Sequence, residues 1–244
     1  MKKLISKIYF SILISFIGSF FLLSQNKDLN PYLYVGDKSE HKRFESEIQA
    51  FEELDKVKDY PKKSILFIGS SSIRLWKNLE ESMSPYNIIQ RGYGGAHYRD
   101  LVFYTNRILS DHSISLIVCF VANDIKGSVK DGSPKEIIEL YDLFVRQVRS
   151  KHPYLPIVQI EITPTSSRWK HREKIKKVNK LINDYCDKKR NMHYIKTFDF
   201  FINERKTPND ELFLSDRLHL NQKGYSIWNK IVKEKIREVL SKDI

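Results

Sequence analysis

The chain has 244 residues, of which 41% are hydrophobic and 30% charged, with only 9 Gly and 8 Pro. This length suits one well-buried domain, and the composition excludes a disordered or collagen-like chain. The net charge is +12, but no nucleic-acid-binding module accompanies it, so we expect no nucleic-acid partner. The densest basic block, 168–180, places Lys and Arg around Ile175 and Val178, and is interpreted as the solvated side of an amphipathic helix.

The first 26 residues differ from the rest of the chain. Three lysines precede an apolar run from Ile8 to Leu23, and the segment contains no acidic residue. Because the run is shorter than the roughly 20 residues that span a bilayer, it favours a secretory signal peptide. No cleavage site of the small-x-small type follows, so an uncleaved N-terminal membrane anchor is the alternative. Either segment predicts export from the cytoplasm, followed by a linker over 27–39 and one domain over 40–244.

Beyond the linker, a first helix is predicted where apolar residues recur at helical spacing over 44–54, and it ends before Pro61. Short β-branched or aromatic runs then alternate with longer helical patterns. The predicted strands are Ile65–Ile68, Ile88–Ile89, Ile114–Val121, Ile157–Ile162 and His193–Phe198. The predicted helices are Ser71–Glu80, Tyr98–Leu109, Pro134–Ser150, Arg168–Lys189 and Gln222–Leu240.

This alternation of strand and helix predicts an α/β fold. Strands joined by helical crossovers form a parallel sheet, here of about five strands, with helices on both faces in a three-layer α/β/α sandwich. Ligands bind such sheets beyond the carboxyl ends of the strands, so the loops that follow strands are the places to look for chemistry.

The first strand runs directly into Gly69-Ser70-Ser71-Ser72 at the start of a helix. Free backbone N–H groups and the positive end of the helix dipole favour a developing oxyanion there. Serine also caps helices often, so this turn by itself indicates either a nucleophile or an ordinary cap. It is not the Gly-x-Ser-x-Gly turn of α/β-hydrolases, because position 73 is Ile.

Two further loops follow the second and third strands. The segment 91–97 contains three glycines, which allow backbone N–H groups to approach a ligand closely. After the third strand comes Ala122-Asn123-Asp124. The Asn123 amide could donate to an oxyanion, or it could form an ordinary Asx turn.

Asp216 and His219 lie in one loop just before the last helix. A carboxylate bonded to the Nδ1–H of histidine fixes the ring tautomer and leaves Nε2 free to take a proton from a serine. A histidine alone would more often be a structural surface residue, so the pair matters only together with the serine turn.

These four segments, in this order, resemble the four blocks of the SGNH hydrolase superfamily, also called the GDSL-like lipases and acylhydrolases. The resemblance covers the chain from about Phe44 to Val239. It is strongest to the subgroup whose first block reads Gly-Ser-Ser-Ser-Ile-Arg, which stands here at 69–74. It implies a flavodoxin-like α/β/α fold and a serine ester hydrolase.

The resemblance also implies roles for individual residues. Ser71 takes the place of the nucleophile, His219 that of its base, and Asp216 that of the partner of His219. The backbone N–H groups of Ser71 and Gly95 and the side-chain amide of Asn123 take the places of the oxyanion donors. This chemistry needs no metal and no organic cofactor, and the sequence shows no cluster with metal-ligand spacing.

Two positions depart from the more widespread family pattern. Ser70 replaces an Asp, as is typical of the resembled subgroup, and Val121 replaces a Gly in the third block. A bulky β-branched residue at 121 can alter the turn that aims Asn123. The expected substrate contacts are His97 and Trp169, although His97 could instead cap the next helix and Trp169 could cover a helix end.

The expected reaction is removal of a short acyl group, such as acetyl, from a small or polysaccharide ester outside the cytoplasm. The linking loops are polar, and no long apolar insertion is available to form a lid or an acyl-chain tunnel. Three alternatives stay open: a lysophospholipase or platelet-activating-factor-like acylhydrolase, an acyltransferase, and a non-catalytic domain that binds a surface polymer.

Overall fold

The computed structural model describes residues 39, 41–110 and 112–241. The predicted signal peptide or anchor over 1–26 lies outside the described residues, as does nearly all of the linker predicted over 27–39. Within the described ranges, no helix is both long and apolar enough to cross a membrane.

A parallel sheet of five strands lies at the centre of the fold, in the order β2-β1-β3-β4-β5. The strands are β1 (Ser64–Gly69), β2 (Ile88–Gly92), β3 (Ile114–Phe120), β4 (Ile157–Ile160) and β5 (Met192–Ile195). Because β2 lies on one side of β1 and the later strands lie on the other, the order switches between β1 and β3, where parallel sheets of this kind bind ligands.

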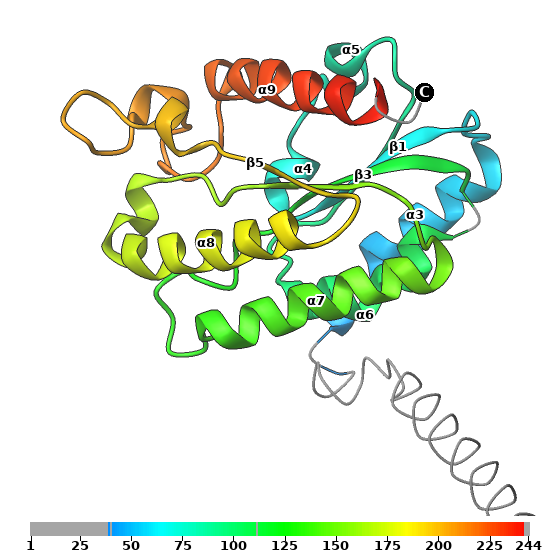
Figure 1. Cartoon of the computed structure of the whole chain (residues 1–244), viewed down its shortest axis with the longest axis horizontal. Helices are drawn as coiled ribbons and strands as arrows, with labels where there is room; N and C mark the ends of the chain where they lie inside the picture. Colours follow the sequence, from blue (N-terminus) through cyan, green and yellow to red (C-terminus); the bar gives the residue numbers. More distant parts are fainter. Residues whose placement is uncertain (1–38, 40, 111, 242–244) are drawn as a thin grey trace, which may run out of the picture.

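Helices cover both faces of the sheet, so the predicted three-layer α/β fold is confirmed. They are α3 (Glu45–Val57), α4 (Ser71–Arg74), α5 (Leu79–Met83), α6 (Tyr98–Leu109), α7 (Pro134–Lys151), α8 (Arg172–Lys188) and α9 (Gln222–Leu240). Short 3-10 turns add η2 (Lys42–Phe44), η3 (Ser166–His171), η4 (Phe198–Phe201) and η5 (Asp210–Leu212). In Figure 1, α5 and α9 lie on one side of the sheet, and α3, α6, α7 and α8 lie on the other.

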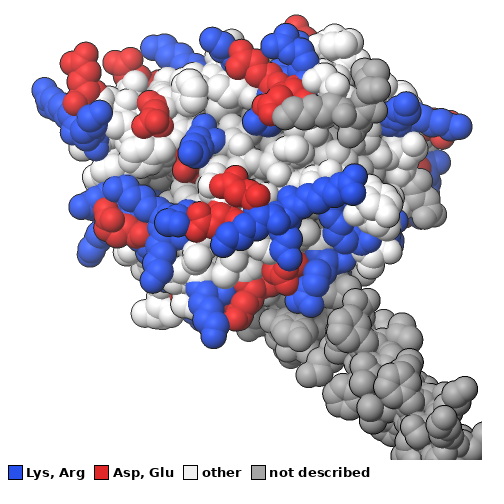
Figure 2. Space-filling view, viewed as in Figure 1, with Lys and Arg blue, Asp and Glu red and all other residues white. Residues whose placement is uncertain are grey.

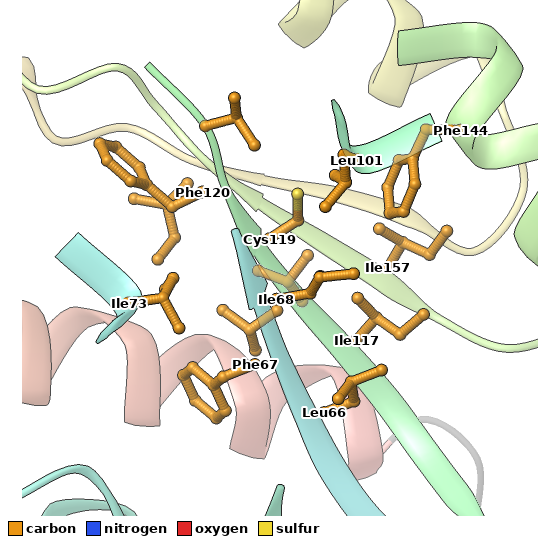
Figure 3. Close-up of a cluster of buried hydrophobic side chains, with 14 of the residues drawn as sticks. Leu66, Phe67, Ile68, Ile73, Leu101, Ile117, Cys119, Phe120, Phe144 and Ile157 are labelled. Carbon is orange, nitrogen blue, oxygen red and sulfur yellow. The ribbon is translucent and has the colours of Figure 1, made fainter. Parts of the chain in front are cut away.

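The core occupies both faces of the central strands, and all six residues of β1 are buried. Figure 3 shows Phe67 and Ile73 on the side of α9, whereas Leu101 and Phe144 reach the sheet from α6 and α7 on the opposite side. Burial on both faces explains why these strands appear in the sequence as continuous apolar runs rather than alternating ones.

Two predicted helices are wrong in their extent. The helix predicted over Ser71–Glu80 is broken into α4 and α5, because the side-chain Nε2 of Gln90 donates to the carbonyls of Ile73 (2.6 Å) and Trp76 (3.2 Å). The Ile73 carbonyl also accepts the Trp76 backbone N–H at 3.3 Å, an i to i+3 bond, so the i to i+4 pattern of an α-helix stops here. The helix predicted over Arg168–Lys189 begins as η3 and becomes α-helical only at α8.

The strand predicted over His193–Phe198 is also too long, since β5 ends at Ile195. The carboxylate of Glu161 accepts the backbone N–H groups of Thr197 (2.6 Å) and Phe198 (2.8 Å). These two donors are therefore not available to a neighbouring strand, and the chain turns into η4.

A close contact between two backbones joins the carboxyl ends of β1 and β3. Gly69 has a φ of +145°, and a Cβ at this position would lie 2.0 Å from the carbonyl oxygen of Phe120. That oxygen accepts the backbone N–H of Ser70 at 2.9 Å. Glycine is required here both by the positive φ and by the approach of the second strand.

We expect Gly69→Ala to lower the free energy of unfolding by about 2 kcal/mol or more, because neither backbone can move without breaking the sheet. Urea denaturation measures this change. Gly132→Ala is the matched control, since its Cβ would meet only the Ile137 side chain, at 3.2 Å. If Gly69→Ala shifted the midpoint no more than the control does, the contact would not constrain the fold.

Candidate active site

Ser71 begins α4 directly after β1, at the switch point of the sheet. The last helix holds this turn in place. The Tyr225 hydroxyl of α9 donates to the Ser72 carbonyl at 2.8 Å, and the indole N–H of Trp76 donates to the Asn229 side chain at 2.8 Å. The rings of Trp76 and Tyr225 also stack, with centroids 5.5 Å apart. The serine turn and the start of α9 therefore form one rigid unit.

The loop that precedes α9 is closed on itself. Phe213 and Leu220 form an antiparallel bridge, and the Leu214 backbone N–H donates to the His219 carbonyl at 2.8 Å. Arg217 occupies the left-handed region at the tip of the loop, with a φ of +54°. The Asn221 side chain caps α9 by accepting the Gly224 backbone N–H at 3.2 Å. This closure fixes the position of His219 relative to α9.

The structure brings together the three residues to which the family resemblance gives the places of nucleophile, base and partner of the base. The Ser71 Oγ lies 3.0 Å from the His219 Nε2, and the His219 Nδ1 lies 2.6 Å from the Asp216 Oδ2. An ionised carboxylate can only accept, so Nδ1 carries the proton and Nε2 is free to accept the Ser71 hydroxyl proton. This is the hydrogen-bond order that activates a serine.

The Asp216 carboxylate is held in its ionised form. Its other oxygen, Oδ1, accepts the backbone N–H groups of Leu218 (2.9 Å) and His219 (3.0 Å). Partial burial raises the pKa of this carboxyl, but the bonds from the His219 ring and from the two backbone groups together outweigh burial, so the pKa lies below its ordinary value. Asp216 therefore stays negative over the pH range in which a histidine titrates.

Asn123 lies across the pocket from the serine turn, and both ends of its amide are bonded. Its Oδ1 accepts a guanidinium N–H of Arg168 at 2.7 Å, and its Nδ2 donates to the Ala96 carbonyl at 3.0 Å. Val121 is fully buried in the core. Asn123 nevertheless lines the pocket together with Ser71 and His219, so the β-branched residue at 121 does not remove it from the pocket wall.

The glycine-rich loop is only partly in the arrangement that the sequence suggests. Gly95 has a φ of +82° and faces open space, and the carbonyl of its neighbour Ala96 is bonded to Asn123. His97 occupies the N-cap position of α6, where its backbone N–H donates to Asp100 at 2.9 Å. Neither Gly95 nor His97 lines the pocket at Ser71. The position of His97 matches the capping alternative.

The pocket at Ser71 encloses about 380 Å³ of space, including the open solvent at its mouth. Its walls come from five loops or helices, and its lining residues include Ser71, His219, Asn123, Thr163, Thr165, Arg168, Phe213, Leu218 and Trp228. Trp169 lies in an adjacent groove that shares Thr165 and Arg168 with this pocket, and the groove also contains Phe198 and Arg172.

Arg168 lines the pocket at Ser71, and the sequence pattern does not predict this position. The pattern over 168–180 predicts a solvated helix face, but Arg168 is 7% exposed and precedes α8 in η3. Two of its nitrogens donate to the Ala122 carbonyl (2.6 Å) and to Asn123 (2.7 Å). Its place in a loop after a strand of a parallel sheet is the signal that could have identified it.

Two other arrangements of charged side chains can mark a site: a metal-binding cluster and a basic patch. Over residues 39, 41–110 and 112–241, no three His, Cys, Asp or Glu side chains are grouped so that they could hold a metal ion. On the face shown in Figure 2, Lys and Arg lie among Asp and Glu rather than in one basic patch.

The sequence pattern of the GDSL-like Lipase/Acylhydrolase family matches residues 69–227. No curated protein matches the chain at a significant level. Among solved structures, a candidate platelet activating factor from Streptococcus pneumonia has a TM-score of 0.70 and 21% identity, covering 80% of this chain and 92% of that one. A candidate acylhydrolase from Bacteroides fragilis has a TM-score of 0.67 and 18% identity, covering 84% and 99%.

An acetyl-xylooligosaccharide esterase from Geobacillus is also similar, with a TM-score of 0.58 and 15% identity, covering 72% of this chain and 94% of that one. At such low identities these structures bear on the fold alone. The family match includes the Ser71 turn, the Asn123 loop and the loop that carries Asp216 and His219. The chain therefore belongs to the GDSL-like lipase/acylhydrolase family and is an ester-bond hydrolase.

Proposed function

We propose that this hydrolase removes a short acyl group, such as acetyl, from a polar or carbohydrate alcohol, with Ser71 as the nucleophile. The observation that carries the proposal is the chain of hydrogen bonds from Ser71 through His219 to Asp216, with distances of 3.0 Å and 2.6 Å. As the Ser71 Oγ attacks the ester carbonyl, Nε2 takes its proton and then gives that proton to the departing alcohol. A water molecule, deprotonated by the same nitrogen, then releases the acid and restores Ser71.

Charge develops on the carbonyl oxygen during both attacks. The Ser71 backbone N–H lies in the first turn of α4, where it has no partner within the helix, and the Asn123 Nδ2 has a second N–H beyond the one bonded to Ala96. We propose that these two groups, together with the backbone N–H of Gly95, form the oxyanion hole. A small rearrangement of the Gly95 loop on substrate binding would complete it.

The size of the pocket supports a short acyl group. The part of the pocket that can hold the centre of a water-sized molecule is only about 20 Å³, which leaves little room for a long acyl chain. Each methylene buried contributes roughly 0.8 kcal/mol, so selection for long chains would require an extended apolar groove. The structural likeness to an acetyl-xylooligosaccharide esterase supports the same substrate class. We propose Trp169 as a contact for the alcohol part, because its groove shares Thr165 and Arg168 with the pocket.

The likeness to a candidate platelet activating factor favours a second candidate, an acylhydrolase that acts on a lipid ester. The N-terminal apolar run motivates the proposal that either enzyme works outside the cytoplasm, as an exported or anchored protein. An acyltransferase would use the same serine chemistry but pass the acyl group to an alcohol instead of water, so the free acid would not be its main product.

The nucleophile is tested by Ser71→Ala. We expect kcat for p-nitrophenyl acetate to fall by about 10⁶-fold, because a serine nucleophile and its base act as one unit. Ser226→Ala is the matched control, since that hydroxyl donates to the Gln222 carbonyl on α9. It should keep the activity of the wild type. Substantial turnover in Ser71→Ala would assign the reaction to another group.

The pH profile tests the base. Burial lowers the pKa of His97 to about 4, and the pKa of Asp216 is below its usual value, so neither group changes charge between about pH 5 and 8. Burial raises the pKa of Asp124 to about 7, so the wild type is compared with Asp124→Asn. A fall of kcat/KM with decreasing pH that both proteins show is the result expected when a neutral histidine acts as the base. We expect this fall, and we expect Asp216→Asn to reduce kcat by about 10²–10⁴-fold while the fold is kept. A profile that is flat from pH 5 to 8 would remove His219 from the role of base.

Acyl length separates the two candidate substrates. We expect kcat/KM to decrease along the series of p-nitrophenyl acetate, butyrate, octanoate and palmitate, because the pocket offers little apolar surface to a long chain. Initial rates measured below the critical micelle concentration give the comparison. A rise toward palmitate would favour the lipid acylhydrolase.

A further inference from the structure

We propose that Arg168 is a positioning residue that sets the orientation of the Asn123 amide and thereby builds the oxyanion hole. The inference deepens the proposed function and rests on it. Arg168 comes from η3, after β4, whereas Asn123 follows β3, so the contact joins two loops at the carboxyl edge of the sheet.

The donor and acceptor groups of the two side chains determine how they can face each other. A guanidinium has five N–H donors and no acceptor, so only the oxygen of the Asn123 amide can face it. The distance of 2.7 Å between a terminal nitrogen of Arg168 and the Asn123 Oδ1 is that of a charge-assisted hydrogen bond. The reversed amide would put two sets of donors against each other. Arg168 therefore excludes the orientation in which Asn123 presents an oxygen to an oxyanion.

The opposite end of the amide then has a defined use. One Nδ2 hydrogen goes to the Ala96 carbonyl at 3.0 Å, which leaves one for the pocket that Asn123 lines with Ser71 and His219. The bond to Ala96 also ties the glycine-rich loop, which includes Gly95, to the same amide. Arg168 thus orients one proposed oxyanion donor directly and holds the loop of a second one through it.

The second bond of Arg168 fixes the backbone on which Asn123 stands. Its other terminal nitrogen donates to the Ala122 carbonyl at 2.6 Å. The family usually has glycine at the position of Val121, and here the turn after Val121 is held by a side chain from another loop. A planar guanidinium can satisfy a carbonyl and an amide oxygen at once, which a lysine ammonium on a flexible stem does less well.

Because Arg168 and its two partners are buried, losing the hydrogen bonds between them would be energetically unfavourable. Arg168 is 7% exposed, and although burial lowers its pKa, an arginine keeps its charge at neutral pH. The nearby carboxyls of Asp131 and Asp124 act in the opposite direction and favour the charged form. If the guanidinium were removed, the Asn123 oxygen and the Ala122 carbonyl would be left without partners in a largely buried place.

The experiment compares Arg168→Met with the wild type on p-nitrophenyl acetate. We expect kcat to fall by about 10²-fold, the effect of misplacing a catalytic group, while KM changes by less than roughly threefold. Arg168→Lys should recover part of the loss. Arg146→Met is the matched control, because Arg146 pairs only with Asp142 along the exposed side of α7, and it should keep the kcat of the wild type.

A double-mutant cycle with Asn123→Ala separates positioning from a general structural role. If Arg168 acts through Asn123, Arg168→Met lowers kcat much less in the Asn123→Ala variant than in the wild type. Additive losses, or an unchanged kcat in a folded Arg168→Met, would overturn the inference while leaving the esterase intact. If Arg168→Met does not fold, an unchanged kcat in Arg168→Lys would overturn it. A wild type that cleaves no ester would instead show that the proposed function itself is wrong.

Discussion

The contact between Gly69 and the Phe120 carbonyl is the constraint on which the rest of the site depends. It is the point at which β1 and β3 end side by side, on either side of the topological switch. Because Ser70 donates to that carbonyl at 2.9 Å, the chain must leave β1 in one direction, and Ser71 becomes the first residue of α4. On the other strand, Asn123 stands three residues beyond Phe120. One backbone contact thus sets the separation between the serine turn and the proposed amide donor.

His219 reaches this point from the far end of the chain. Its approach depends on α9, which is fastened to the serine turn by Tyr225 and Trp76 and closes the sheet face shown with Phe67 in Figure 3. The loop with Asp216 and His219 is bonded within itself, and its last residue, Asn221, caps α9. The hydrogen bond from Ser71 to His219 therefore follows from packing of aromatic rings below the site, rather than from contacts at its surface.

The architecture follows from the sequence because the strands are buried on both faces and the helices are amphipathic. What the sequence does not show is where distant side chains take over backbone bonds. Gln90 ends α4 from a neighbouring strand, and Glu161 takes the donors that would extend β5. Arg168 is another distant side chain that bonds a backbone group, the Ala122 carbonyl. Its spacing in the sequence fits the solvated face of a helix, and only the fold shows that it is buried.

Local spacing was enough to pair Asp216 with His219, because one loop contains both. It could not connect them to Ser71, which lies 148 residues away from His219, and only the family resemblance suggested that link. His97 illustrates the opposite case. A histidine beside glycines suggests a ligand contact; in the fold it takes the N-cap position of α6, and the residues that line the pocket at Ser71 do not include it.

The most direct test of the account is the site of covalent labelling by a fluorophosphonate, which reacts with a serine only when a base and an oxyanion hole activate it. The account predicts a single adduct, mapped by peptide mass to the segment that contains Ser71, at a rate that falls sharply in His219→Ala. Labelling of a different residue, or labelling of Ser71 at an equal rate in His219→Ala, would contradict it.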